Sequence, residues 1–520
     1  MLTDVLLAFL SALLLVLSFP KFDMAILVWV ALVPLLIAIR DKSLKHAFAL
    51  SFLTGISFFA GVFYWINEVS GFKLADFFPL LAYFGLYFSI FGLGFNFISK
   101  KTPFSPIVTA PVLWVSTEYL RSNAGFLGLP CALLGHSQYV QLPIIQICSF
   151  TGVYGVSFLI VMTNVAIREV LCSYFCPVHV ESIESDNSRK RRRNSTTSFI
   201  LTLVMLSGTV VYGFWALSEN PKAEKLSMTV IQGNIPQEIK WNQAFRKRNF
   251  AKHLRLTKEA LENDDTSLIV WPETAVPGPF RRDLYLLHSI TNLAVETKTH
   301  LLIGSSQRPK FGSREFRRKN WFNSGFLISP RGRIEGQYNK IRLMPFGEYL
   351  PFEDQLPWPS RLVSKASHYI PGREHTIFHV DDAKFGVLIC WENVFPGLVR
   401  EFVKKGANAM INITNEAWFG ETAAPYQFVA MSVFRAVENR VSVARSANTG
   451  ISCFIDPYGR IMGRVENNNR DIFVEGYLTQ EIPLSQKRTF YTIYGDIFAY
   501  INLTICVLVL ALSFLKIKRE

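Results

Sequence analysis

Three reactive side chains stand close to apolar runs that are typical of buried strands. Glu273 ends the run SLIVWPE at 267–273, and Cys390 lies in FGVLICW at 385–391. Lys340 lies in GQYNKIRLMPFGEYLPF, directly after the hairpin-like run WFNSGFLISPRGRIEGQY. A carboxylate, an ammonium and a thiol can together transfer an acyl group through a covalent thioester. These residue types therefore predict a nucleophilic Cys390, with a packed thiol or a disulfide to Cys453 as the alternatives.

Each of the three side chains has a chemical role in such a reaction. A free thiol has a pKa of about 8.5, so only a few per cent is thiolate at neutral pH. Glu273 can accept the thiol proton and return it to the leaving group. Lys340 can stabilise the negative charge on the carbonyl oxygen, a contribution of roughly 3 to 4 kcal/mol. No histidine is required, and none falls inside these motifs.

A layered α/β domain over 218–494 is expected to position these residues. Strands are predicted at 227–235, 267–273, 300–306, 321–329, 385–391 and 407–414, and helices at 242–263 and 396–406. Strands that alternate with helices are typical of α/β folds. Ligand crevices in such sheets form at the carboxyl ends of the strands. Glu273 and Cys390 are therefore expected to meet at one end of the sheet.

Long apolar runs on both sides of this domain predict membrane helices. Half of the 520 residues are hydrophobic and only 18% are charged. Eight helices are predicted, at 5–19, 24–39, 47–66, 77–98, 104–120, 152–167, 198–217 and 495–515. The predicted domains are thus a seven-helix bundle at 1–217, the catalytic domain at 218–494, and a helix with a basic tail at 495–520. A helix needs ~20 residues to cross the bilayer core, and the first two segments are shorter than that. A re-entrant hairpin is therefore the alternative for these two segments.

The basic residues beside these helices predict which side each loop faces. One side collects Arg40, Lys42, Lys45, Lys100, Lys101, Arg168, Arg189, Lys190, Arg191, Arg192, Arg193, Lys516, Lys518 and Arg519. The other side has Lys21, Lys73 and Arg121. Basic loops stay in the cytoplasm, so both termini are expected there and 218–494 outside. The tract at 189–193 is then a topology anchor, and no nucleic-acid partner is expected.

A metal site is not expected. Cys172, Cys176 and His179 are close in sequence, but they lack a paired zinc-type spacing.

The motifs WPETAVP, YNKIRLMPFGEYLP and LICWENVFP, in this order, resemble the Glu, Lys and Cys motifs of the nitrilase superfamily. That resemblance implies a four-layer αββα sandwich. With its flanking helices, the whole chain resembles the apolipoprotein N-acyltransferases of the bacterial inner membrane. The motifs at 232–241, 345–352 and 415–420, which read QGNIPQEIKW, PFGEYLPF and NEAWFG, are specific to that branch.

The resemblance implies a ping-pong reaction without a cofactor, catalysed on the periplasmic side. A glycerophospholipid, typically phosphatidylethanolamine, gives its sn-1 acyl chain to Cys390. The α-amino group of the S-diacylglyceryl cysteine at the N-terminus of an apolipoprotein then attacks the thioester. Two lipid-bearing substrates would also account for the membrane helices, which a hydrolase of small amides does not need.

Further site residues follow from the same resemblance. Glu392 is expected to support Lys340 or Glu273. Glu348 is expected to lie on a mobile loop over the site, with an exposed loop charge as the alternative. Trp241 and Trp418 match family tryptophans near the active site, and simple packing is the alternative for both. Trp391 stands where the family commonly has tyrosine, so it keeps an aromatic ring but lacks the hydroxyl.

Two other functions stay open at this level. A membrane-tethered carbon-nitrogen hydrolase or lipid hydrolase would use the same three residues with water as the acceptor, and a free acid would be its product. A non-catalytic scaffold would be expected to lack one of the three residues. Because water must be kept from the thioester in a transferase, the loop 345–352 is expected to close over the site.

Overall fold

The computed structural model describes residues 1–70, 72–101, 104–174, 184–219, 224–240, 242–276, 278–309, 312–313, 320–357, 368–485 and 487–517. The chain forms two compact units. The first consists of Met1–Asn220 and Tyr494–Glu520, and the second of Pro221–Ile493.

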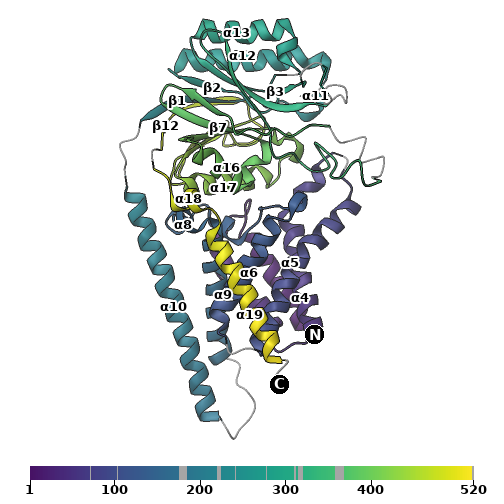
Figure 1. Cartoon of the computed structure of the whole chain (residues 1–520), viewed down its shortest axis with the longest axis vertical. Coiled ribbons are helices and arrows are strands. Elements are labelled where there is room, and N and C mark those ends of the chain that lie inside the picture. The colour runs from purple at the N-terminus through teal and green to yellow at the C-terminus, as the bar shows by residue number, and fades with distance from the viewer. Residues whose placement is uncertain are drawn as a thin grey trace. The chain divides into compact units, whose positions relative to one another are not determined.

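The first unit is helical (Figure 1). Its longer helices are α1 (Leu2–Leu17), α4 (Leu44–Val62), α5 (Leu74–Lys101), α6 (Pro106–Ser122), α9 (Val153–Tyr174), α10 (Glu184–Ser218) and α19 (Ile497–Ile517). Short helices are η1 (Ala25–Leu27), α2 (Val28–Ala31), α3 (Val33–Ala38), η2 (Tyr64–Glu68), η3 (Gly125–Leu127), η4 (Leu134–Gln138), α7 (Leu142–Ile145) and α8 (Cys148–Thr151).

Helix occurs in each of the eight segments predicted to cross the membrane. Within the described residues, four helices are long and apolar enough to do so, at Leu44–Val62, Leu74–Lys100, Val153–Tyr174 and Arg192–Ser218. The apolar helices Leu2–Leu17, Ala25–Ala38 and Ile497–Ser513 are shorter. Helix α6 has only 17 residues and carries the buried Glu118 and Arg121. The count of eight therefore stays a prediction, as does the alternative hairpin at the first two segments.

The second unit contains two six-stranded mixed sheets. The first sheet has the order β12-β1-β2-β3-β4-β5 and the second β11-β10-β9-β8-β7-β6. The strands of the first are β1 (Lys225–Gln232), β2 (Leu268–Val270), β3 (His300–Gln307), β4 (Phe322–Ile328), β5 (Ile334–Asn339) and β12 (Gly476–Pro483). Those of the second are β6 (Ile377–Val380), β7 (Ala383–Ile389), β8 (Ala409–Thr414), β9 (Ser442–Ala447), β10 (Cys453–Ile455) and β11 (Ile461–Arg464).

Three parallel strands form the centre of each sheet. In the first sheet β1 pairs with β2 and β2 with β3 in parallel, and in the second β7 pairs with β8 and β8 with β9. These six strands are buried almost throughout, as expected for parallel strands covered on both faces. The remaining strands extend each sheet by antiparallel pairing.

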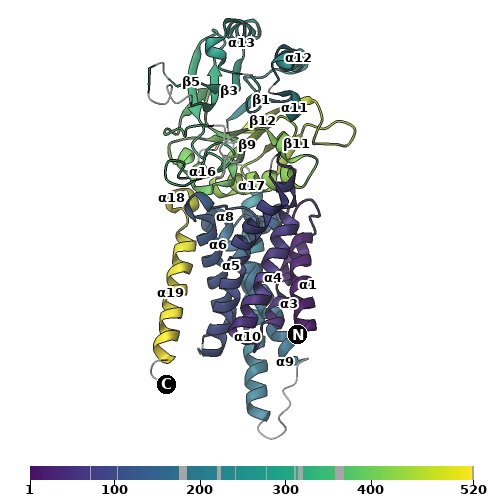
Figure 2. The same ribbon diagram turned by 90° about the vertical axis from the view of Figure 1, so that its right-hand side faces the viewer.

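Helices cover the outer faces of the two sheets. Helices α12 (Arg246–Asn263) and α13 (Leu284–Thr297) lie over the first sheet, and α16 (Pro396–Lys404) and α17 (Ala424–Asn439) over the second. Figure 2 shows the same layers from the side. A cluster of buried apolar residues that includes Phe250, Trp271 and Ile290 joins α12 and α13 to their sheet. The predicted αββα arrangement is confirmed.

Shorter helices in this unit are α11 (Gln237–Lys240), η5 (Gln243–Phe245), η6 (Phe280–Arg282), η7 (Cys390–Val394), η8 (Glu416–Phe419) and α18 (Phe490–Tyr494).

Candidate active site

Glu273 follows β2, at the carboxyl end of the parallel strands. Its chain passes so close to β3 that a Cβ on Gly304 would lie 2.5 Å from the main-chain oxygen of Pro272. Glycine at this position therefore lets the loop approach the sheet. The carboxylate is only 7% exposed. It accepts hydrogen bonds from the side chain of Asn323 at 2.7 Å and from the main-chain N–H of Asn415 at 2.9 Å.

Cys390 lies where β7 turns sharply into η7. Its φ of 58° is in the left-handed region, a conformation that costs roughly 1 to 2 kcal/mol for a residue other than glycine. The side-chain amide of Asn412 donates to the main-chain oxygens of Leu388 and Cys390, both at 3.1 Å. Asn412, on the neighbouring strand β8, thus stabilises the strained turn. Strained backbone of this kind is common at functional sites, where the surrounding structure keeps it in place.

Burial and the nearby Glu273 raise the pKa of the Cys390 thiol, against the opposing effect of the Lys340 ammonium. The thiol is therefore protonated at rest, and a base is needed to produce the nucleophile. A hydrogen bond from the main-chain N–H of Trp391 acts in the opposite direction and favours the thiolate.

Lys340 follows β5, the second strand of the predicted hairpin, which β4 and β5 confirm. Its main-chain N–H donates to the oxygen of Asn323 at 2.8 Å. The side chain is 1% exposed, and its ammonium lies 2.9 Å from the carboxylate of Glu348. Burial opposes the charged form of Lys340, but Glu348, Cys390 and Glu273 together outweigh it and raise its pKa. The ammonium is therefore charged throughout the physiological range.

The loop that contains Glu348 is joined to the other site residues by hydrogen bonds. Besides Lys340, its carboxylate accepts from the main-chain N–H of Met344 at 2.8 Å and from the side chain of Asn323 at 3.3 Å. The amide of Asn323 thus donates to both Glu273 and Glu348. A continuous set of contacts runs from Glu273 through Asn323 and Glu348 to Lys340.

Glu392 is fully buried and holds main chain on both sides of the site. It accepts from the N–H groups of Ile341 at 2.7 Å, Arg342 at 2.9 Å and Ile389 at 2.8 Å, and from the hydroxyl of Tyr338 at 2.9 Å. Ile341 follows Lys340 and Ile389 precedes Cys390. Burial raises the pKa of Glu392 to about 7, although the N–H groups of Arg342 and Ile389 oppose the rise. Glu392 thus contacts the chain beside Lys340 and Cys390.

The three tryptophans differ in their surroundings. Trp391 is buried, packs edge-on against Phe395 at 4.9 Å between ring centroids, and donates its indole N–H to the main-chain oxygen of Arg342 at 2.7 Å. It therefore brings its own hydrogen-bond donor to this position. Trp418 lies in η8 and is 39% exposed. Trp241 lies outside the described residues.

A buried ion pair supports the Cys390 turn from behind. Arg445 on β9 donates to the side-chain oxygen of Asn412 at 2.6 Å and forms a salt bridge with Glu416 in η8. Both partners are buried. A Cβ on Gly450 would lie 1.8 Å from the Glu416 carboxylate, so glycine is needed there. Asn415, whose N–H binds Glu273, directly precedes Glu416 and is held by the same segment.

Several of these residues were not predicted from the sequence. They are Asn323, Tyr338, Asn412, Asn415, Glu416, Arg445 and also Lys240, whose buried ammonium donates to the main-chain oxygen of Glu273 at 2.9 Å. The quoted motifs QGNIPQEIKW and NEAWFG contain three of them, and Asn323 lies in the predicted strand WFNSGFLIS. Asn415 directly follows β8, and this place at the end of a strand was the one feature of the sequence that could have indicated a site residue there. Nothing in the sequence indicates that Arg445, in the middle of β9, has a polar partner.

The cysteines and other metal-binding side chains offer no competing chemistry in the described part of the chain. Cys390 and Cys453 are both free, so the disulfide alternative is wrong. No group of three or more His, Cys, Asp or Glu side chains suited to a metal occurs among the described residues. Cys176 and His179 lie outside them.

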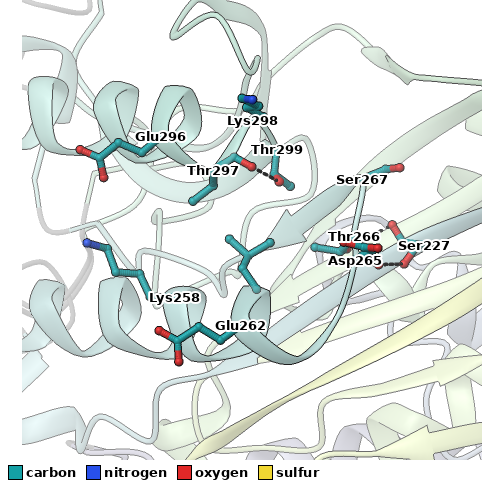
Figure 3. A pocket seen from close by; sticks show the side chains of 11 residues that line it. Ser227, Lys258, Glu262, Asp265, Thr266, Ser267, Glu296, Thr297, Lys298 and Thr299 are labelled. Atoms are coloured by element: carbon teal, nitrogen blue, oxygen red, sulfur yellow. Dashed lines mark hydrogen bonds between the residues drawn. The ribbon is translucent and has the colours of Figure 1, made fainter.

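A surface hollow of about 710 Å³ lies at the opposite ends of the strands, between α12 and α13. Figure 3 shows Lys258 and Glu262 on α12 and Glu296 on α13. The remaining lining residues are Ser227, Leu261, Asp265, Thr266, Ser267, Thr297, Lys298 and Thr299. Its walls mix both signs of charge and contain none of the predicted site residues.

The geometry supports acyl transfer by a cysteine nucleophile. The nucleophile and the carboxylate follow parallel strands of the two sheets, where ligand crevices form. An ammonium that remains charged is available to stabilise an oxyanion. All three groups interact electrostatically.

Comparisons with known proteins agree with this chemistry. Residues 11–166 match the model of the apolipoprotein N-acyltransferase N-terminal domain, and residues 228–490 match the carbon-nitrogen hydrolase model. The apolipoprotein N-acyltransferase of Geobacter metallireducens is 37% identical over 98% of this chain and 95% of its own length. That of Thermotoga maritima is 30% identical over 100% of this chain and 95% of its own length. The structure of Saccharomyces cerevisiae Nit3, a member of branch 10 of the nitrilase superfamily, is 20% identical, with a TM-score of 0.38 over 51% of this chain and 93% of that one. The chain belongs to the apolipoprotein N-acyltransferase family, membrane-embedded acyltransferases of the nitrilase superfamily.

Proposed function

We propose that this protein moves the sn-1 acyl chain of a glycerophospholipid, through a thioester on Cys390, to the α-amino group of the N-terminal S-diacylglyceryl cysteine of apolipoproteins. The observation that carries the proposal is the set of contacts from Glu273 through Asn323 and Glu348 to Lys340, beside Cys390. The relatives named above support the reaction class, and phosphatidylethanolamine is the donor we expect.

In the first half-reaction, the sulfur of Cys390 attacks the carbonyl carbon of the sn-1 ester. Glu273 accepts the thiol proton as the new carbon–sulfur bond forms. The charge that develops on the carbonyl oxygen is stabilised by Lys340. The ester carbon–oxygen bond then breaks, Glu273 gives its proton to the departing glycerol oxygen, and a lysophospholipid leaves.

In the second half-reaction, the neutral α-amino group of the acceptor attacks the thioester carbonyl. Glu273 accepts a proton from the attacking nitrogen, and the carbon–sulfur bond breaks. The Cys390 sulfur recovers its proton from Glu273, and an amide is released. Acid and base roles thus alternate on one carboxylate, and the site returns to its starting state.

The arrangement in the membrane is part of the proposal. We infer that the catalytic domain at 218–494 lies on the periplasmic side of the bacterial inner membrane and that both termini are cytoplasmic. The basic loops support this orientation. Reaction of single engineered cysteines at the N-terminus and at an exposed site in 218–494 with a membrane-impermeant thiol reagent, in intact and in permeabilised cells, tests it.

The central test is the intact mass of the purified protein in phospholipid micelles, before and after a synthetic diacylglyceryl-cysteine peptide is added. A fatty-acyl increment that maps to Cys390 and discharges onto the peptide amine is expected. The variant Cys390→Ser should carry no thioester. An increment that water alone removes would identify a lipid hydrolase on the same fold, and no increment at all would refute Cys390 as the nucleophile.

A further inference from the structure

The segment 368–372 is hydrogen-bonded to two parts of the candidate site at once. The main-chain N–H of Tyr369 donates to the main-chain oxygen of Glu348 at 2.9 Å, and that of Gly372 donates to the main-chain oxygen of Lys340 at 2.7 Å. Glu348 and Lys340 are also the two partners of a salt bridge. One short segment therefore binds the main chain of both partners.

Main-chain contacts also pair this segment with the residue before β4. The N–H of Trp321 donates to the oxygen of His368 at 3.2 Å, and the oxygen of Trp321 accepts from the N–H of Ile370 at 2.9 Å. Trp321 and Tyr369 thus form an isolated parallel bridge. The segment is therefore attached to the first sheet beside β4, the strand that contains Asn323.

The side chain of Tyr369 adds an attachment to β3. Its hydroxyl forms a hydrogen bond of 2.9 Å with the hydroxyl of Ser306. Ser306 is buried and is paired with Asn323 across β3 and β4. Burial raises the pKa of the Tyr369 phenol to about 12, and Glu348 and Glu273 act in the same direction. The phenol therefore stays protonated over the physiological range and keeps its hydrogen bond.

These attachments matter because other hydrogen bonds of the Glu348 loop lie inside the loop. The N–H groups of Gly347 and Glu348 both donate to the main-chain oxygen of Met344, so these two bonds do not fix the loop to the sheet. Burial opposes the charge of Lys340, and Glu348 contributes most to outweighing it. Movement of the loop away from the site would therefore take that support from Lys340 and admit water.

We propose that Tyr369 is a positioning residue, whose main-chain N–H holds the Glu348 loop at the site and whose hydroxyl bonds to Ser306 on β3. The inference rests on the proposed function in one respect, namely that Glu348 and Lys340 serve acyl transfer from Cys390. Without the hydroxyl bond the loop opens more often. Water then adds to the thioester carbonyl, the carbon–sulfur bond breaks, a free fatty acid leaves, and a proton of the water returns to the Cys390 sulfur.

Hydrogen–deuterium exchange of the purified full-length protein in detergent tests this hold on the loop without any substrate. Exchange is measured by mass spectrometry in peptides that contain residues 344–349 and 368–372. Tyr369→Phe and Ser306→Ala each remove one hydroxyl of the pair, and the double variant removes both. Tyr477→Phe is the matched control, because it removes a hydroxyl that bonds to the end of α12, at the other edge of the first sheet.

We expect exchange in both ranges to rise roughly two- to tenfold in Tyr369→Phe and in Ser306→Ala, which is the effect of losing one net hydrogen bond. Because a single bond links the two residues, the double variant should exchange no faster than the faster single variant. Tyr477→Phe should exchange like the wild type. Unchanged exchange in Tyr369→Phe, or effects that add in the double variant, would overturn the proposal. If Ser306→Ala does not fold, as judged by thermal unfolding, the comparison of Tyr369→Phe with Tyr477→Phe still decides.

A second readout connects the loop to the chemistry. The acylated protein is mixed with the diacylglyceryl-cysteine peptide, and the ratio of free fatty acid to peptide amide is measured. This ratio should rise in Tyr369→Phe by the same factor as the exchange. A purely structural contact would lower the temperature of unfolding without changing the ratio, and that result would overturn the positioning role.

The two readouts separate the inference from the proposed function. Faster exchange in variants of a protein that forms no acyl-thioester with phospholipid would uphold the hold of Tyr369 on the loop and refute the acyl transfer. Normal transfer with unchanged exchange in every variant would do the reverse.

Discussion

Replacing Glu392 by glutamine tests whether one buried carboxylate holds both Lys340 and Cys390 in place. The carboxylate accepts hydrogen bonds from three main-chain N–H groups and one hydroxyl. A glutamine has one accepting oxygen and one donating nitrogen. In either orientation, its nitrogen faces at least one N–H group that then has no acceptor.

The expected loss of stability follows from that count. A hydrogen bond to a charged group contributes about 1.5 to 3 kcal/mol, and a buried N–H left without a partner costs about 1 to 3 kcal/mol. The free energy of unfolding should fall by roughly 2 to 5 kcal/mol. Because Ile389 directly precedes Cys390, the turn should also move, and a displacement of the order of 1 Å can cost ~100-fold in rate.

Two assays follow the change. Thermal unfolding in detergent reports the stability of the second unit, and intact mass reports the rate of thioester formation in phospholipid micelles. Tyr338→Phe is the control, since it removes one hydroxyl but leaves the three N–H groups their acceptor. A Glu392→Gln protein that unfolds at the wild-type temperature and forms the thioester at the wild-type rate would refute the idea that Glu392 holds Lys340 and Cys390 in place.

The loss of stability caused by Glu392→Gln should depend on pH. Burial raises the pKa of Glu392 from its ordinary 4.5 to about 7, so the folded state binds this proton more tightly than the unfolded chain does. The associated stabilisation is complete below 4.5 and is lost as the pH rises through 7. Glutamine does not titrate, so the stability difference between the wild type and Glu392→Gln should narrow between pH 5 and pH 8.

Four further predictions concern neighbouring residues. Glu348→Gln should weaken the contact of the 345–352 loop with the site, and lysophospholipid release without amide formation should rise; unchanged partitioning between the two products would exclude a lid role for the loop. Asn323→Asp places a third carboxylate between two others, so transfer at neutral pH should fall at least about tenfold, with part of the activity regained towards pH 5, as a pH profile of amide formation will reveal. Gly450→Ala should displace Glu416 and break its buried ion pair, at a cost of about 3 to 5 kcal/mol measured by thermal unfolding. Trp391→Phe should lose the indole hydrogen bond and about 1 kcal/mol of stability, whereas Trp391→Leu should lose the ring packing as well and unfold at a lower temperature still.

Much of the fold was predictable because buried strands leave a local signal. Five of the six central strands, β1, β2, β3, β7 and β8, are runs of apolar residues and were predicted, as was β4. The sixth, β9, reads SVARSA and was not predicted, although it is buried. The missed strands carry weaker patterns. Strand β12 reads GYLTQEIP, and most of its positions are partly exposed. Edge strands of this kind show neither a continuous apolar run nor a strict alternation.

The sequence by itself predicted the side chains that we propose as the reacting groups. A carboxylate and a thiol each follow a strand of apolar residues, and a lysine follows a hairpin, so Glu273, Lys340 and Cys390 could be named from local pattern and motif order. Where a polar residue stands relative to the end of a strand is a local property of the chain. It needs no knowledge of which strands become neighbours.

Only the tertiary structure decided what surrounds those side chains. Asn323 joins Glu273 to Glu348, and Lys240 approaches the main chain of Glu273, through contacts between segments 50 and 33 residues apart. Burial, charge pairing and hydrogen bonding set the protonation states at the site, and all three depend on which elements pack together. The sequence predicts the proposed reacting groups, while the packing of the two sheets determines which residues contact these groups and set their protonation states.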